Sequence, residues 1–172
     1  MFMNDITFVY TDAFIWHSLI YSLLFIVAII PVGLVNPRIM LRDYPKEIQA
    51  AVPPKTEEER GMMVFFAVPL VVIMAGYPAG VSWYYRPEEA TFQYFFATTW
   101  AMMITFNLFD LLVIDWLLFC TITPKLVVIR GTEGNPGYKN YRFHFLGFLK
   151  GIAITAFLSA FVSGVLVLFT KL

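Results

Sequence analysis

The sequence predicts an all-α integral membrane protein, a bundle of four transmembrane helices. Hydrophobic residues make up 59% of its 172 residues and charged residues only 14%, whereas a typical soluble domain is about half apolar and about a quarter charged. Each of four apolar runs exceeds the roughly 20 residues that a helix needs to cross a hydrocarbon core of about 30 Å. The runs lack the alternation of barrel strands, so helices fit them best. We expect one transmembrane domain over 1–172, with helices at about 14–35, 62–85, 87–123 and 145–170.

Basic residues distinguish the two ends of these helices. Loops 36–61 and 124–144 hold nine of the lysines and arginines, whereas the opposite side holds only Arg86 and Lys171. Positively charged loops tend to remain in the cytoplasm. The sequence therefore predicts that both loops are cytoplasmic and ordered, and that both termini lie outside (N-out/C-out) in a multi-pass protein whose surroundings are the lipid bilayer.

The first helix follows a segment without the basic region that begins a secretory signal peptide, so we expect it to be retained. His17 lies about one turn inside this helix, on the outer side, while His144 is expected at the opposite face. Two histidines so placed do not share a metal or haem. The single cysteine, Cys120, fits a small buried hydrophobe. No metal site and no cofactor are predicted.

The second helix carries a start signal and several helix breakers. Thr56 and Glu59 have the spacing of a capping box. Pro69 and Pro78 each remove a backbone hydrogen bond within the helix. We interpret these prolines as kinks that serve packing. The alternative is that the freed carbonyls coordinate a cation, as in the broken helices of transporters.

The third helix, expected to begin at Pro87, contains the stretch TFNLFDLLVIDWLLF. At α-helical spacing its Asn107, Asp110 and Asp115 fall within an arc of about 140°. A charged residue at the bilayer centre costs about 2.5–3.5 kcal/mol on insertion scales. These three residues therefore form our candidate ion- or ligand-binding site. The alternative is a set of buried structural polar groups.

Several basic side chains are candidate partners for these acids. Lys150, just inside the fourth helix, is the partner we expect for Asp115, although its side chain could instead reach to the interface. Arg142 and His144 are further candidates if their loop folds back, and His17 completes the set of candidate partners.

The fourth helix carries stripes of small residues, a pattern that lets helices approach closely. The contact is either within the bundle or across a homo-oligomer. One stripe consists of Gly151, Thr155, Ser159 and Ser163, and the other of Ala156, Ala160 and Gly164.

The sequence leaves three functions open. The zero net charge does not suggest nucleic acid as a partner, and no P-loop, GxSxG, HExxH or CxxC motif is present. The first hypothesis is a transporter- or channel-like protein that binds or passes a proton, cation or small ligand at the acids. The second is a membrane-embedded enzyme acting on a lipid or other hydrophobic substrate. The third is a structural or accessory subunit of a membrane complex.

Overall fold

The computed structural model describes residues 11–171, and every regular element in that range is a helix. Four helices are long and apolar enough to cross a membrane, which confirms the predicted helical architecture. The segment before Thr11, on which the expectation of a retained N-terminus partly depends, lies outside the described residues. The spans are α1 (Asp12–Val35), α3 (Glu57–Tyr84), α4 (Phe92–Phe109) continued by the π-helix η3 (Asp110–Ile122), and α5 (Tyr141–Phe169).

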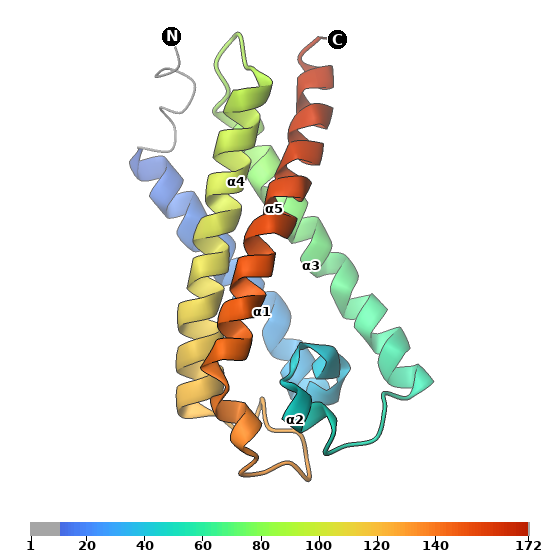
Figure 1. Ribbon diagram of the computed structural model, residues 1–172. Helices are drawn as coiled ribbons and strands as arrows, with labels where there is room; N and C mark the ends of the chain where they lie inside the picture. The colour runs from blue at the N-terminus through green and yellow to red at the C-terminus, as the bar shows by residue number, and fades with distance from the viewer. Residues whose placement is uncertain (1–10, 172) are drawn as a thin grey trace.

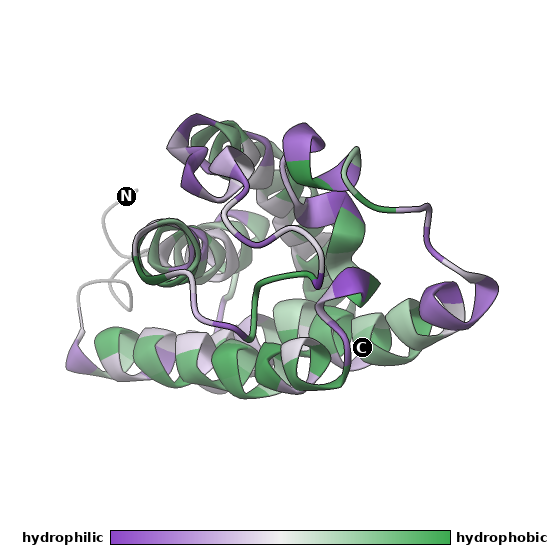
Figure 2. Cartoon of the chain, turned by 90° about the horizontal axis from the view of Figure 1, so that it is seen from below, coloured by the Kyte–Doolittle hydropathy of each residue, from purple (hydrophilic) through white to green (hydrophobic). Residues whose placement is uncertain are grey.

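Three short helices lie in the loops: the 3-10 helix η2 (Pro37–Asp43), α2 (Lys46–Gln49) and the 3-10 helix η4 (Pro136–Lys139). α4 and α5 run side by side, while α1 and α3 are inclined behind them (Figure 1). We call the end where α1 begins and α5 finishes the termini end, and the end that carries η2, α2 and η4 the loop end. Hydrophilic residues gather in the loops and helix ends, whereas the helix bodies are mostly hydrophobic (Figure 2).

Threonine caps fix where two of the spans begin. The Thr56 side chain accepts from the Glu59 amide while the Glu59 carboxylate accepts from the Thr56 amide, so the predicted capping box is present and α3 begins at Glu57. The third span begins at Phe92 rather than Pro87, because the Thr91 hydroxyl accepts from the Tyr94 amide and caps the helix there. Pro87 belongs to the turn before it.

Pro78 lies in the part of α3 that contacts α1. A proline leaves the carbonyl four residues earlier without its helical donor. That carbonyl belongs to Met74, and it accepts a hydrogen bond of 3.1 Å from the hydroxyl of the fully buried Tyr21. The freed carbonyl is thus satisfied by a neighbouring helix, which supports the packing interpretation of Pro78.

The small residues of α5 pack against α4 within the chain. Thr155, Ser159 and Ser163 are buried, and the Ser159 hydroxyl lies 3.2 Å from the Met103 sulfur. A Cβ atom on Gly151 would come within 2.6 Å of the Asn107 side chain. The first stripe therefore forms a seam between α5 and α4 within the chain.

The loops are tied to the helices by charged side chains. Arg38 forms an ion pair with Glu59, with 2.7 Å between Nε and Oε1, and also donates to the Pro53 carbonyl. The Lys139 ammonium donates to the carbonyls of Cys120 and Thr121 at the end of η3. A cation there suits the negative end of a helix. Both contacts hold the loop end in place beneath the spans.

Candidate functional site

A cavity of about 640 Å³ lies between the spans and the loops at the loop end. Its walls come from the second half of α1, the end of α4, η3, the start of α5, η2 and the segment after η3. Most of the lining is apolar. The polar and charged side chains on it are Arg42, Asp43, Tyr44, Asn107, Asp110, Asp115 and His144.

The π-helix η3 places two carboxylates on this cavity. A π-helix pairs each residue with the one five positions on, and Asp110 and Asp115 are five positions apart. The wider turn takes a smaller angular step per residue than an α-helix, so the two carboxylates come closer to one face than α-helical spacing implies. Both line the cavity, and their charges interact.

Asp115 is held by a histidine from α5. Its Oδ1 lies 2.9 Å from Nδ1 of His144, whose side chain is only 5% exposed. His144 Nε2 is buried and has no hydrogen-bond partner among residues 11–171. A buried unpaired N–H is costly, so the tautomer that fits carries its hydrogen on Nδ1 and donates it to Asp115. One oxygen of Asp115 is thereby engaged by a neutral donor.

Asp110 differs from Asp115 because it has no such partner. In the described part of the chain the Asp110 side chain takes part in no ion pair and no hydrogen bond. Its carboxylate lines the cavity instead. A carboxylate without a protein donor has its oxygens available for a bound cation or a proton.

Asp43, at the end of η2, brings a third carboxylate to the cavity. Asp43 keeps contact with solvent, but partial desolvation by the surrounding protein raises its pKa, Lys55 opposes the rise, and the Asp115 carboxylate adds to it. Burial in turn lowers the pKa of Lys55. Among the described residues, Arg42 is the one lysine or arginine that lines the cavity. When its three carboxyl groups are ionised, the cavity carries more negative charge than Arg42 balances.

Asn107 lines the cavity but is committed to packing. Its amide nitrogen donates a 3.1 Å hydrogen bond to the Phe148 carbonyl of α5. The same side chain fills the space that a Cβ on Gly151 would take. Asn107 thus helps to set the distance between α4 and α5, and its carbonyl oxygen and second N–H make no hydrogen bond within residues 11–171.

The other expected partners lie elsewhere. Lys150 is exposed and makes no ion pair among the described residues, so the position we expected it to take beside Asp115 belongs to His144. The reason is geometric: α5 begins at Tyr141, which puts His144 in its first turn facing η3, and six residues turn Lys150 about 120° away. Arg142 is exposed as well. His17, in α1 at the termini end, bonds to the Tyr77 hydroxyl at 2.9 Å.

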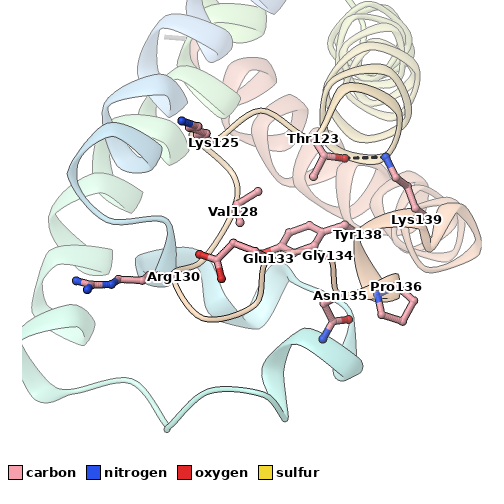
Figure 3. Close-up of a pocket in the computed structure, with 10 residues that line it drawn as sticks. All are labelled: Thr123, Lys125, Val128, Arg130, Glu133, Gly134, Asn135, Pro136, Tyr138 and Lys139. Carbon is pink, nitrogen blue, oxygen red and sulfur yellow. Dashed lines mark hydrogen bonds between the residues drawn. The ribbon is translucent and has the colours of Figure 1, made fainter.

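A second hollow of about 560 Å³ lies within the loop that precedes α5. It is bordered by the basic residues Lys125, Arg130 and Lys139 (Figure 3). Lys139 points to Thr123, to which it is hydrogen bonded, while Lys125 and Arg130 point away from it. These cations do not converge on one point, so the hollow lacks the arrangement that binds an anion.

Sequence reasoning identified part of this site and missed the rest. Asp110 and Asp115 stand out because they interrupt an apolar run. Arg42 and Asp43 do not, because they belong to a loop in which both charge signs are common. Their place on the cavity follows from the fold of η2 beneath α1, which no local pattern indicates.

The arrangement can attract and hold a positive charge in an apolar setting. It does not resemble a metal centre: within residues 11–171 no three His, Cys, Asp or Glu side chains come together in a way that could hold a metal ion. The chain matches no known family model, no curated protein and no solved structure.

Proposed function

We propose that this protein binds a cation, a positively charged small ligand or a proton at Asp110 and Asp115, as a transporter- or channel-like membrane protein does. The observation that carries the proposal is the cavity of about 640 Å³ on which both carboxylates lie. Intramembrane acids are costly and usually functional. Asp110 is the binding group, because the described residues give it no partner of its own.

Excess negative charge supports a cation over an anion. The cavity carries Asp43, Asp110 and Asp115 against Arg42. His144 neutralises none of this charge in the tautomer that fits its surroundings, since it donates a hydrogen bond as a neutral group. A cation or a proton that enters the cavity relieves the repulsion between the carboxylates.

The orientation that we propose places the loop end in the cytoplasm and both termini outside. The basic residues of loops 36–61 and 124–144 support it through the positive-inside tendency. In a Cys120→Ser background, Glu133→Cys should react with a membrane-impermeant maleimide only after the cells are opened, while Glu88→Cys should react in intact cells. The reverse pattern would invert the topology.

The binding proposal is tested by infrared difference spectroscopy of the full chain in lipid. Exchange between neutral and mildly acidic buffer, and between buffers with and without added cation, should reversibly change the carboxyl bands. Asp110→Asn should remove a distinct part of the change, because that carboxyl group is the one left open to the cavity.

Glu88→Gln is the matched control, since it removes a carboxylate from the exposed turn before α4. Glu88→Gln should leave unchanged the carboxyl bands that Asp110→Asn removes. If Asp110→Asn folds normally and the spectra of the two variants are the same, Asp110 does not bind protons or cations and the proposal fails. Carboxyl bands that respond to neither pH nor cations in the unmodified protein would also refute it.

A membrane-embedded enzyme is the second candidate, and the apolar lining together with the Asp115–His144 hydrogen bond favours it. In such an enzyme the imidazole nitrogen opposite the carboxylate would act as the base. That nitrogen, His144 Nε2, is buried without a partner. Its burial is why we place ligand binding first. Turnover of a lipid substrate that is lost in His144→Gln would reverse this order.

A further inference from the structure

The cavity walls carry information about the ligand beyond its charge. Its volume of about 640 Å³ falls within the range of about 300–1,000 Å³ that small-molecule sites occupy. Aliphatic side chains such as Ile29 of α1 and Ile114 and Leu118 of η3 form the walls. Such walls suit a hydrocarbon body and offer little to the hydration shell of an inorganic ion.

The Asp and Arg side chains that line this cavity come from η2 and η3. Asp110 and Asp115 share one face of η3, and Asp43 lies near enough for its charge to interact with that of Asp115. The facing wall from α1 contributes only apolar residues and Gly33 to the lining. The cavity is therefore amphipathic: η3 and η2 supply carboxylates next to apolar side chains, and α1 supplies hydrocarbon.

The two carboxylates of η3 differ in what already binds them. His144 donates to Asp115 at 2.9 Å and fixes that carboxylate in place. Asp110 has no protein donor within the described range. An incoming N–H donor thus finds an open acceptor at Asp110, and Asp115 adds a second charge one π-turn away.

We propose that the ligand is an organic ammonium ion with an apolar body, whose charged nitrogen binds at Asp110 and whose hydrocarbon part lies against α1 and η3. This inference rests on the proposed function and names the class of ligand for the same site. An ammonium group needs few oxygen acceptors, whereas a hard divalent cation needs about six to eight oxygen ligands in its shell. The apolar walls supply the rest of the contact.

Arg42 and Asp43 lie at the loop side of the cavity, where η2 meets η3. Arg42 repels a cation and Asp43 attracts it, and Lys55 also acts on Asp43. No titratable side chain of α1 lines the cavity, and His144 is the one that α5 contributes among the described residues. Binding of a cation therefore depends chiefly on Asp110 and Asp115, the carboxylates of η3.

The test uses hexylammonium chloride as the probe and the purified full chain in lipid nanodiscs, with empty nanodiscs subtracted. Hexanol and hexanoate have the same hydrocarbon body, with no charge and with a negative charge respectively. Isothermal titration should give hexylammonium an affinity at least about tenfold above that of either, because a hydrogen bond to a charged group contributes that much or more. Potassium chloride at the same concentration should not compete.

Variants separate charge recognition from packing. Asp110→Asn should reduce the hexylammonium affinity by at least about tenfold and leave that for hexanol unchanged. Glu88→Gln, outside the cavity, should leave both unchanged. His144→Gln should weaken binding less than Asp110→Asn does, because His144 positions Asp115 and does not contact the ammonium group.

Equal affinities for hexylammonium and hexanol would overturn this inference, as would preferred binding of hexanoate. If hexylammonium fails to bind while the carboxyl bands still respond to pH or small cations through Asp110, the ligand class is wrong and the proposed function stands. If neither response occurs, both fail. If the unmodified protein binds hexylammonium more tightly than hexanol and hexanoate, this supports the inference even where a variant does not fold.

Discussion

The termini end and the loop end of this protein are packed in different ways. At the termini end the spans pack directly on one another, and Tyr21, Phe95 and Met102 are fully buried there. At the loop end the buried cluster lies between the loops and η3, with Ile48 and Ile129 at its centre. The cavity lies between the spans and these loops. One end is held by helix packing, and the other is held by loops with a cavity above them.

The polar contacts of the two ends differ as well. At the termini end the Thr98 hydroxyl lies 2.8 Å from that of Ser82, and Tyr21 satisfies the carbonyl that Pro78 frees. At the loop end Asp110 faces the cavity without a partner in the described range. Two buried side-chain atoms of the termini end, Ser18 Oγ and Trp100 Nε1, also lack a partner within residues 11–171. The difference between the ends is therefore in the kind of group left open, which at the loop end is a carboxylate.

The largest expected effect on stability comes from truncating one side chain at each end of the third span, which consists of α4 and η3. Met102→Ala at the termini end should lower the free energy of unfolding by about 2–5 kcal/mol, because it leaves a void in close packing. Leu118→Ala, on the wall of the cavity, should cost clearly less, because it widens a space that already exists. Thermal unfolding in nanodiscs, followed by tryptophan fluorescence, measures both. Equal losses would refute the contrast between the two ends.

A smaller effect is expected at the seam between α4 and α5, which joins the two ends. Gly151→Ala places a Cβ against Asn107 and disturbs its hydrogen bond to the Phe148 carbonyl. Overpacking of this kind costs about 1–3 kcal/mol, and each kcal/mol lowers the unfolding midpoint of a chain this size by about 2–4 °C.

Gly164→Ala is the matched control on the same helix, because nothing lies within 4 Å of a Cβ there. It should leave the midpoint unchanged or raise it slightly, since alanine favours helices over glycine. If both substitutions behave alike, the close approach at Gly151 does not limit the stability of the seam.

The smallest effect concerns charge at the loop end. Partial desolvation raises the pKa of Asp43, Lys55 opposes the rise and Asp115 adds to it. An ionised Asp43 is therefore less favourable in the folded than in the unfolded chain, and the penalty appears as pH rises through the raised pKa. At neutral pH Asp43→Asn should raise the unfolding midpoint by about 1–2 °C, as expected for a charge effect of about half a kcal/mol.

This gain should disappear in acid, near and below the unperturbed aspartate pKa of about 3.9, where both states are protonated. Glu47→Gln removes a carboxylate from exposed α2 and provides the control for net charge. A gain from Asp43→Asn that persists unchanged in acid would show that repulsion from Asp115 and desolvation are not its cause.

Particular elements show how much the sequence by itself determined. The four spans follow from length and hydropathy alone, because an unpaired backbone cannot remain in lipid. The start of α3 follows from Thr56 and Glu59, whose capping contacts are local. Asp110 and Asp115 can be singled out for the same local reason, since a carboxylate in an apolar run is conspicuous in any fold.

Only the tertiary structure decided what surrounds those carboxylates. The π-helical geometry of η3 turned Asp110 and Asp115 toward one face, and the early start of α5 put His144 rather than Lys150 beside Asp115. Asp43 joined them because η2 folds beneath α1. These relations depend on contacts between segments far apart in sequence. These contacts contribute to stability only when the whole bundle has formed, so they cannot be predicted from a local pattern of residues.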